Sequence, residues 1–280
     1  MIKVTPEEIK VLSKYVADIS GIFLDQSKAY LIESRLGSLV EEFGCTSYRE
    51  FYFKAKSDAS RSLEKRIIEA IATYETSFFR DTYPFELLKY KILPDLIDKR
   101  REKSPNFFPV PIRIWSAACS TGQEVYSIAI VLKELLPDLK KFNVKILGTD
   151  ISGRAIARAS YGEYNKFEIE RGLSEERLQK YFSRNSNAWK IKDEIRTMAT
   201  FKKQNLMKPF TGMGKFDIIF CRNVAIYFTP RDRVTLFNKI GDVLEPDGYL
   251  IIGSTESLAS ICPKFEPKRY LRSVFYQLRG

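Results

Sequence analysis

The sequence predicts an α/β protein in which an all-helical domain precedes a doubly wound, mostly parallel sheet. From about residue 109 onward, short apolar segments alternate with helical segments of roughly 10–15 residues, the pattern of a parallel sheet covered on both faces. Before that point, apolar residues recur only at helical spacing. The 280 residues, 44% of them hydrophobic and 29% charged, suffice for one or two folded domains. We therefore expect a helical domain with its linker at residues 1–81 and an α/β domain at residues 82–280.

The first eighty residues predict a small helical bundle. Thr5 provides an N-cap, Pro6 suits the first helical position, Glu8 completes a capping box, and Gly21 ends this first helix. The later helices are expected over residues 27–43, from a capping box formed by Ser47 and Glu50, and from Ser62 onward.

The remaining elements follow the alternation of strand and helix. Strands are expected near residues 111–115, 144–148, 217–221, 249–253 and 274–278, with helices near 124–136, from 156, and over 231–244. The alternation breaks between Leu173 and Leu206. There, short segments at 189–192, 195–198 and 200–202 predict an inserted antiparallel sheet at about residues 187–204. Residues 99–111, rich in Lys, Arg and Pro, are the expected flexible connector.

The residue types that are missing exclude several kinds of chemistry. The chain has no histidine, which removes His-based triads, imidazole acid–base catalysis and zinc sites that need imidazole. Its four cysteines form no CxxC pair, so we expect buried, reduced thiols and no metal site. No apolar run is long enough to span a bilayer, and the N-terminus lacks the apolar core of a signal peptide. We therefore expect a cytoplasmic protein without membrane insertion.

The net charge of +11 lies entirely outside the first eighty residues. Those residues contain 12 Lys and Arg against 12 Asp and Glu, whereas the rest of the chain contains 34 against 23. A basic domain favours an acidic partner, such as nucleic acid, a membrane surface or an acidic protein segment. A solvated surface without a ligand is the alternative.

A loop of small residues, 117–122, follows the first strand, and Asp150 ends the second strand. Such a loop lets the backbone approach a ligand closely at a helix N-terminus, and an acidic residue at this strand end accepts hydrogen bonds from ribose hydroxyls. The loop has neither a GxGxxG pattern nor a P-loop lysine, so we do not expect a pyrophosphate. Adenosine without phosphates indicates S-adenosylmethionine. A tight turn with Asp150 as a helix cap is the structural alternative.

Four longer strings closely resemble the chemotaxis receptor methyltransferases, the CheR family. They are ETSFFRD at 75–81, WSAACSTGQEVYS at 115–127, GTDIS at 148–152 and FDIIFCRNVAIYF at 216–228. The likeness extends from the helical bundle to residues 254–257, essentially the whole chain. It implies a Rossmann-like class I methyltransferase domain with a small inserted antiparallel β-subdomain. It also implies S-adenosylmethionine-dependent methylation of protein glutamates, with S-adenosylhomocysteine as the product.

The resemblance also implies which residues form the site. It places Arg80 and Tyr227 at the reaction centre, with Arg80 near the transferred methyl group or the substrate carboxylate. For the cofactor it implies Thr76 and Arg80 on the linker side and Gln123 or Glu124 facing the methionine portion. Asp150 is expected at the ribose, and Asn205 and Leu206 near the adenine. Arg222 and Asn223 are expected to line the same pocket. Two alternatives stay open: Tyr227 and Phe228 as core aromatics, and Arg222 in a structural ion pair.

The implied reaction agrees with the lack of histidine. A glutamate side chain has an ordinary pKa of about 4.3 and is ionised at neutral pH, so no general base is needed. The methyl group is already activated on a sulfonium, so the enzyme mainly has to align two reactants. One arginine that steers the carboxylate and one tyrosine hydroxyl near the methyl group suffice.

Several positions depart from the family pattern. Tyr74 stands where the family usually has Asn, which puts one polar cofactor contact in question, Thr255 replaces the usual His, and Gln123 replaces a frequent Glu. Residues 182–191 are shorter than in members that bind a receptor's C-terminal pentapeptide and lack their GxG, so we expect a pentapeptide-independent enzyme. The second helix, usually rich in arginine, has only Lys28 and Arg35, which leaves receptor docking by that helix open.

Three functions from different classes therefore compete. The leading hypothesis is a monomeric enzyme that methylates glutamates on the cytoplasmic helices of a chemoreceptor. A nucleic-acid methyltransferase would use the basic charge, but RNVA at 222–225 stands where base-amino methylases have Asn/Asp-Pro-Pro-aromatic. The third hypothesis is a cofactor-binding, non-catalytic signalling protein of the same fold, against which the retention of Arg80, Asp150 and Tyr227 argues.

Overall fold

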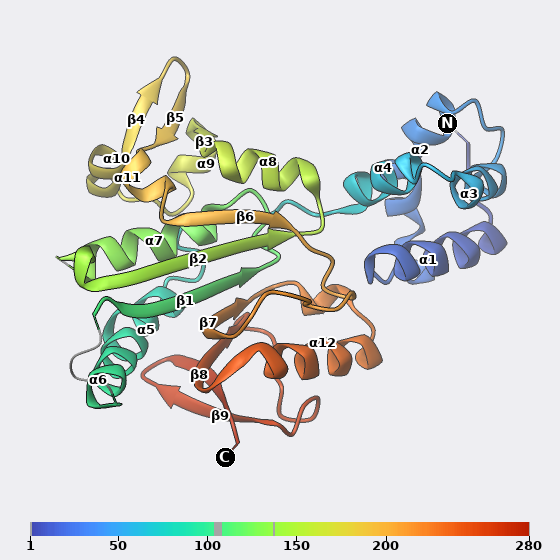
Figure 1. Cartoon of the computed structure of the whole chain (residues 1–280). Coiled ribbons are helices and arrows are strands. Elements are labelled where there is room, and N and C mark those ends of the chain that lie inside the picture. Colours follow the sequence, from blue (N-terminus) through green and yellow to red (C-terminus); the bar gives the residue numbers. More distant parts are fainter. Residues whose placement is uncertain (1, 104–107, 137, 280) are drawn as a thin grey trace.

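The computed structural model describes residues 2–103, 108–136 and 138–279, and it places an all-helical domain beside an α/β domain (Figure 1). The helical domain contains α1 (Pro6–Ser20), the 3₁₀ turn η1 (Gln26–Lys28), α2 (Ala29–Glu42), α3 (Tyr48–Ser57) and α4 (Ser62–Ile71). Its own apolar core is centred on Leu12, Ile32, Leu36, Phe51 and Ile67. The four predicted helices are confirmed, and Gly21 ends α1 with a φ of 82°.

The helix caps of this domain agree with the prediction in one case and differ in another. Thr5 and Glu8 form both bonds of the capping box of α1. At α3 the Ser47 hydroxyl accepts from the Glu50 N–H as expected. The Glu50 carboxylate, however, accepts from the N–H of Thr46 at 2.7 Å rather than from that of Ser47. The predicted capping box of α3 is therefore wrong in its second bond, because Glu50 reaches one residue further back.

Residues 72–82 link the two domains, and the domain boundary expected at residue 81 stays a prediction. After the linker, α5 (Tyr83–Leu87), the π-helical turn η2 (Leu88–Ile92) and α6 (Leu93–Lys103) follow one another without a break. The sequence analysis did not predict these helices. Because α6 continues to Lys103 and the next strand begins at Val110, the expected connector at 99–111 is shorter than predicted; its residues 104–107 lie outside the described residues.

The α/β domain is built on a seven-stranded sheet in the order β6-β2-β1-β7-β8-β10-β9. Its strands are β1 (Val110–Ala117), β2 (Phe142–Asp150), β6 (Ala199–Lys203), β7 (Phe216–Cys221), β8 (Leu244–Ile252), β9 (Phe265–Tyr270) and β10 (Ser273–Leu278). The strands from β6 to β8 are parallel, and β10 runs antiparallel to both of its neighbours. The predicted mostly parallel sheet is confirmed, with β9 as a strand that the sequence analysis missed.

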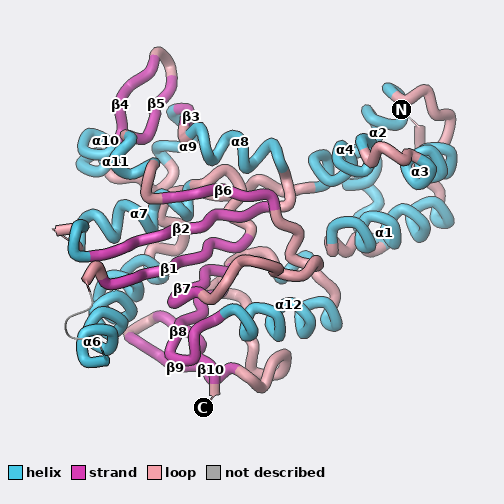
Figure 2. Tube along the Cα trace, viewed as in Figure 1, coloured by secondary structure: helices cyan, strands magenta, loops and turns pink. Residues whose placement is uncertain are grey.

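Helices cover both faces of the sheet, as Figure 2 shows. Alternate residues of each strand face opposite sides, so Ile218 and Phe220 of β7 join a core with α5, α6 and α7 (Gln123–Leu135), while Ile219 and Cys221 join a core with α12 (Pro230–Val243). The α/β domain also contains α8 (Gly153–Tyr161) and the 3₁₀ turn η3 (Leu139–Lys141). The doubly wound architecture follows from this two-sided burial.

A second, three-stranded antiparallel sheet is inserted between α8 and β6. It contains β3 (Glu163–Asn165), β5 (Ala188–Ile191) and β4 (Phe182–Asn185), accompanied by α9 (Lys166–Glu170), α10 (Glu175–Tyr181) and α11 (Asp193–Arg196). The predicted range of 187–204 was misplaced. Residues 199–203 form β6 of the main sheet, where Phe201 packs onto the main core, and the strand expected at 195–198 is replaced by α11 and the turn that follows it.

The carboxyl ends of β1 and β2 point toward the helical domain (Figure 1). Two hydrogen bonds tie the end of α1 to this edge: Asn205 Nδ2 donates to the Ile19 carbonyl at 2.9 Å, and the Phe23 N–H donates to the Tyr227 carbonyl at 2.8 Å. Gly21 makes this approach possible, because a Cβ there would lie 2.5 Å from Cγ of Met207. Ligands of parallel sheets bind at this edge, so the helical domain lies beside the expected site.

Substitution of Gly172 would test how tightly the linker packs at Phe78. Its φ is 97°, and an added Cβ would lie 2.0 Å from the carbonyl oxygen of Phe78, whereas Gly212 has a φ of 73° and nothing within 4 Å. We expect Gly172→Ala to lower the free energy of unfolding by about 2–4 kcal/mol, against about 1 kcal/mol for Gly212→Ala, which carries only the backbone strain. Urea denaturation measures both; equal losses would show that the linker yields freely.

Candidate active site

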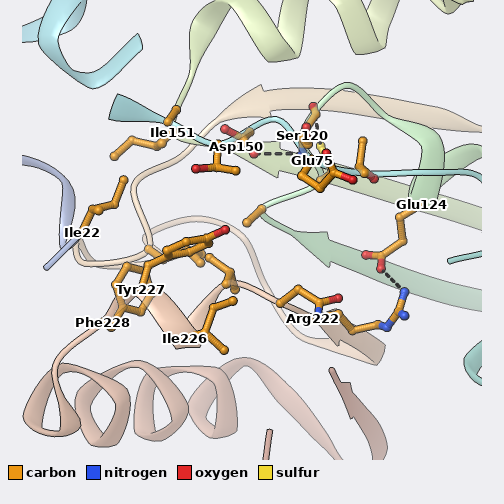
Figure 3. A pocket seen from close by; sticks show the side chains of 18 of the residues that line it. Ile22, Glu75, Ser120, Glu124, Asp150, Ile151, Arg222, Ile226, Tyr227 and Phe228 are labelled. Atoms are coloured by element: carbon orange, nitrogen blue, oxygen red, sulfur yellow. Dashed lines mark hydrogen bonds and ion pairs between the residues drawn. The ribbon is translucent and has the colours of Figure 1, made fainter. Parts of the chain in front are cut away.

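A pocket lies at the carboxyl ends of β1, β2 and β7, between the two domains. It encloses about 1080 Å³ of space, part of it open to solvent. In Figure 3, Asp150 and Ile151 lie on one side of this space and Tyr227 and Phe228 on the other. Its wall comes from the end of α1, the linker, the loops after β1 and β2, and the turn after β7; the lining includes Ser20, Ile22, Thr76, Arg80, Ala118, Cys119, Ser120, Glu124, Asp150, Ile151, Leu206, Arg222, Asn223, Ile226, Tyr227 and Phe228.

The loop after β1 reaches the pocket through left-handed backbone. Ala118, Ser120 and Gly122 have φ values of 61°, 51° and 96°, a conformation that glycine adopts readily and that strains the backbone of Ala118 and Ser120. The Ser120 N–H donates to Oδ2 of Asp150 and the Ser152 N–H to Oδ1, each at 2.9 Å. Burial raises the pKa of Asp150, and these two N–H donors oppose the rise. Protein groups alone therefore fix this carboxylate at the pocket wall (Figure 3).

Arg222 forms a buried ion-pair cluster with Glu124 and Asp81, which we call the Arg222 cluster. Its side chain is 2% exposed; Nη1 contacts Glu124 at 2.8 Å and Nη2 contacts Asp81 at 2.7 Å and the Arg80 carbonyl at 2.8 Å. Glu124 also accepts from the Ser116 hydroxyl at 2.7 Å. The cluster thus joins β7, α7 and the linker, which is the structural role that the sequence analysis left open for Arg222. Nε of Arg222 has no partner within the described part of the chain.

Asn223 continues the turn after β7 with a φ of 56°. Its N–H donates to Oε2 of Glu256 at 2.9 Å, and the same oxygen accepts from the Gly253 N–H at 2.7 Å. Glycine suits position 253, because an added Cβ would lie 2.6 Å from Oε2 of Glu256. One carboxylate therefore fixes the ends of β7 and β8 next to each other.

The two residues expected at the reaction centre line the same pocket, one from the linker and one from the turn after β7. Arg80 lies in the linker, where Nη1 donates to the Glu75 carbonyl at 3.2 Å. Tyr227 ends the 3₁₀ turn η4 (Ala225–Tyr227), and its backbone is bonded to Phe23 of the helical domain. Tyr227 is partly exposed in the pocket rather than enclosed in the core, whereas Phe228 is buried.

The structure brings most of the predicted site residues together, with two exceptions. Thr76, Arg80, Glu124, Asp150, Leu206, Arg222, Asn223 and Tyr227 all line the pocket. Gln123 does not: its side chain is 1% exposed and its Oε1 accepts from the Thr121 hydroxyl at 2.8 Å. Asn205 also lies outside the lining, since its amide bonds the Ile19 carbonyl and the Met207 N–H. For these two residues the structure indicates support of the α7 N-terminus and of the domain contact.

Sequence reasoning missed another group at the pocket's edge. The Tyr74 hydroxyl lies 2.9 Å from Oε2 of Glu69 and 3.1 Å from the Ser152 hydroxyl. We call these three residues the Tyr74 junction, because they come from the linker, α4 and the N-cap of α8. A departure from the family pattern was the only sequence signal at Tyr74, and nothing in the sequence marked Glu69 as its partner.

The remaining polar chemistry near the pocket is limited. Cys119 lines the pocket, but burial raises the pKa of its thiol well above the ordinary value, so a thiolate nucleophile is disfavoured. Within residues 2–103, 108–136 and 138–279, no group of three or more Cys, Asp or Glu side chains is arranged to hold a metal ion. No described helix has the length and apolar character needed to cross a membrane.

Comparisons with known proteins agree with this geometry. Residues 7–72 match the family description "CheR methyltransferase, all-alpha domain", and residues 74–271 match "CheR methyltransferase, SAM binding domain". Similar proteins include a chemotaxis protein methyltransferase of Vibrio parahaemolyticus, 38% identical and covering 99% of both chains, and Cher2 of Pseudomonas putida, 38% identical over 92% of this chain and 93% of that one. Another, from Borreliella burgdorferi, is 40% identical over 92% of this chain and 90% of its own.

Fold, pocket and matched domains define an S-adenosylmethionine-dependent methyltransferase with a helical N-terminal domain. More particularly, the chain belongs to the CheR family of chemotaxis protein methyltransferases. The family resemblance predicted from the sequence strings is thereby confirmed, as are the fold class and the cofactor.

The Arg222 cluster predicts a large loss of stability when its cation is removed. We expect Arg222→Met to lower the free energy of unfolding by about 3 kcal/mol or more, because Glu124 is left buried without its partner. Arg66→Met is the matched control, since the Arg66–Glu42 pair is exposed and solvent screens it. Chemical denaturation measures both variants. Similar, small losses in the two variants would contradict a structural role for the cluster.

Proposed function

We propose that this chain methylates glutamate side chains on the cytoplasmic helices of a chemoreceptor, giving glutamyl 5-O-methyl esters and S-adenosylhomocysteine. The observation that carries the proposal is the meeting of Arg80 and Tyr227 in one pocket with Asp150 at the strand ends. The names of the similar chemotaxis methyltransferases support a receptor as the substrate. A cytoplasmic location and a monomeric state accompany the proposal as predictions.

The pocket's residues suit the proposed cofactor. Asp150 presents a fixed carboxylate to ribose hydroxyls, and the small residues at 117–122 leave room for a close backbone approach. Leu206 and Ile151 supply apolar surface for an adenine. The Glu124 carboxylate offers a polar contact near the α7 N-terminus. We therefore assign cofactor contacts to Thr76, Arg80, Glu124, Asp150, Leu206, Arg222 and Asn223, and only indirect support to Gln123 and Asn205.

The proposed reaction requires the chain's own residues only to bind and align the two reactants. When bound, S-adenosylmethionine supplies a methyl group already activated on its sulfonium. The chain would need no general base for this reaction, because the acceptor carboxylate is ionised at neutral pH. Arg80 steers that carboxylate by a charge-assisted hydrogen bond, and the Tyr227 hydroxyl fixes the reacting groups in line. The side chains of Ile22 and Ile226 add apolar surface to the pocket wall.

Two competing functions receive less support. A nucleic-acid methyltransferase would explain the net charge of +11, yet the turn after β7 is occupied by Asn223 bonded to Glu256 instead of a base-binding motif. A non-catalytic signalling protein would explain the substitutions at Tyr74 and Thr255. Against it, Arg80 and Tyr227 both line the cofactor pocket.

Transfer of radiolabelled methyl groups to a chemoreceptor cytoplasmic fragment tests the proposed function. We expect label that alkali releases, and at least about a tenfold lower rate in Arg80→Ala because the carboxylate loses its charged partner. The matched control is Arg101→Ala, an exposed arginine on α6 that does not line the pocket. Its rate should equal that of the unaltered protein.

Each other result of that assay selects an alternative. Label on DNA but not on receptor fragments from the same organism would favour the nucleic-acid enzyme. Calorimetric binding of S-adenosylhomocysteine without label on any acceptor would favour the non-catalytic protein. Equal losses in Arg80→Ala and Arg101→Ala would remove Arg80 from the reaction centre.

We also propose that receptor recognition does not use a C-terminal pentapeptide. The β4–β5 hairpin supports this, because only Ser186 and Asn187 separate the two strands. The α2 helix and the turn η1 before it offer little free basic surface either: Arg35 of α2 donates to the Ile71 and Ala72 carbonyls, and Lys28 of η1 pairs with Asp25. We expect no measurable binding of a receptor's C-terminal pentapeptide by titration calorimetry, and equal methylation of receptor fragments with and without it. Micromolar binding would overturn this part of the proposal.

A further inference from the structure

We propose that Tyr74 is a positioning residue for the cofactor site: it holds together the loops after β1 and β2, whose N–H groups orient Asp150, and ties them to the helical domain. The inference rests on the proposed placement of the cofactor against Asp150. Tyr74 does not line the pocket, so it acts through other residues.

The hydroxyl end of Tyr74 joins the helical domain to the loop after β2. It lies 2.9 Å from Oε2 of Glu69, 3.0 Å from the Glu69 carbonyl and 3.1 Å from the Ser152 hydroxyl. Ser152 donates to the Glu69 carboxylate as well and accepts from the Ala155 N–H at 2.9 Å as the N-cap of α8. The Arg154 N–H adds a bond to Glu69 at 3.3 Å. The start of α8 is therefore fastened to α4.

The backbone of Tyr74 joins the same linker to the loop after β1. The Ser120 hydroxyl donates to the Tyr74 carbonyl at 3.3 Å, while the Ser120 N–H donates to Asp150. Ser152, which meets the Tyr74 hydroxyl, gives its N–H to the other oxygen of Asp150. The contacts form a closed ring: Tyr74, Ser152, Asp150, Ser120 and back to Tyr74. Both donors that orient Asp150 are thus held by one linker residue.

Charge and burial strengthen this ring. Burial raises the pKa of Tyr74 to about 12, so its hydroxyl remains a donor across the physiological range. For Glu69, burial raises the pKa, but hydrogen bonds from Ser152, Tyr74 and the Arg154 N–H outweigh it and leave the pKa below its ordinary value. An ionised acceptor that is half-buried makes stronger hydrogen bonds than a neutral one. The Tyr74 junction is therefore a firm support rather than a surface contact.

The test is the affinity for S-adenosylhomocysteine in Tyr74→Phe, which removes only the hydroxyl. We expect the Kd from titration calorimetry to rise about five- to tenfold, because the loops around Asp150 lose a hydrogen bond to a charged group. The matched control is Tyr249→Phe: Tyr249 is buried, its pKa is also raised to about 12, and its hydroxyl accepts from Lys99 at 3.4 Å. It neither lines the pocket nor contacts the junction, so its Kd should not change.

A second variant keeps the test independent of how Tyr74→Phe folds. Glu69→Gln keeps the side-chain shape on α4 but removes the charge, and it should also raise the Kd, although Glu69 does not line the pocket. Because both residues act through Ser152, the Kd of the double variant should rise by less than the product of the two single effects. Thermal melting of every variant separates a loss of stability from a loss of affinity.

The possible results distinguish the proposed cofactor placement from the positioning role of Tyr74. If Asp150→Ala binds S-adenosylhomocysteine as well as the unaltered protein, the proposed cofactor placement fails, and this inference fails with it. If Asp150→Ala loses affinity while Tyr74→Phe and Glu69→Gln bind normally, the cofactor placement stands and the positioning role of Tyr74 is wrong. A melting temperature lowered equally in Tyr74→Phe and Tyr249→Phe, with both Kd values unchanged, would likewise make Tyr74 a purely structural residue.

Discussion

The buried guanidinium of Arg222, which follows the end of β7, constrains the edge of the sheet formed by the carboxyl ends of its parallel strands. Arg222 is 2% exposed, and transferring a cation into such surroundings is costly unless carboxylates and carbonyls surround it. Its partners come from α7 and from the linker, which are far apart in the sequence. The linker must therefore lie across the strand ends for the charge to be compensated. Arg80 is carried into the pocket by the same segment, so the position of a proposed reacting residue follows from the pairing of a buried one.

The second constraint is that the pocket belongs to neither domain alone. Ser20 and Ile22 supply part of its wall from the helical domain, and the α/β domain supplies the loops after β1, β2 and β7. Contacts on two sides fix this arrangement: Asn205 and Tyr227 bind the end of α1, and the Tyr74 junction binds α4. The helical domain is thus connected to the pocket by hydrogen bonds as well as by the residues that it contributes to the wall.

Local patterns predicted the parts of the fold that local chemistry determines. The capping box of α1, the strand at 216–221 and the Asp at the end of β2 depend on neighbours in sequence, and all lie where the sequence predicted. The strand at 199–203 was misassigned because periodicity cannot tell which sheet a short strand will join; the packing of Phe201 decides that. Gln123 and Asn205 illustrate the same limit for the site. The resemblance implied cofactor contacts for both residues, yet a neighbouring hydroxyl and a distant carbonyl engage their side chains outside the pocket lining.

The proposed role of Tyr74 is one way in which a departure from a family pattern can preserve a site. The phenol at this position reaches Glu69 and Ser152 and does not line the pocket. It supports the loops, because both N–H donors of Asp150 belong to residues that Tyr74 also contacts. A chemistry that needs no general base depends mainly on alignment, and alignment depends on how firmly the loops are held. A residue outside the pocket can therefore matter to such an enzyme as much as one that lines it.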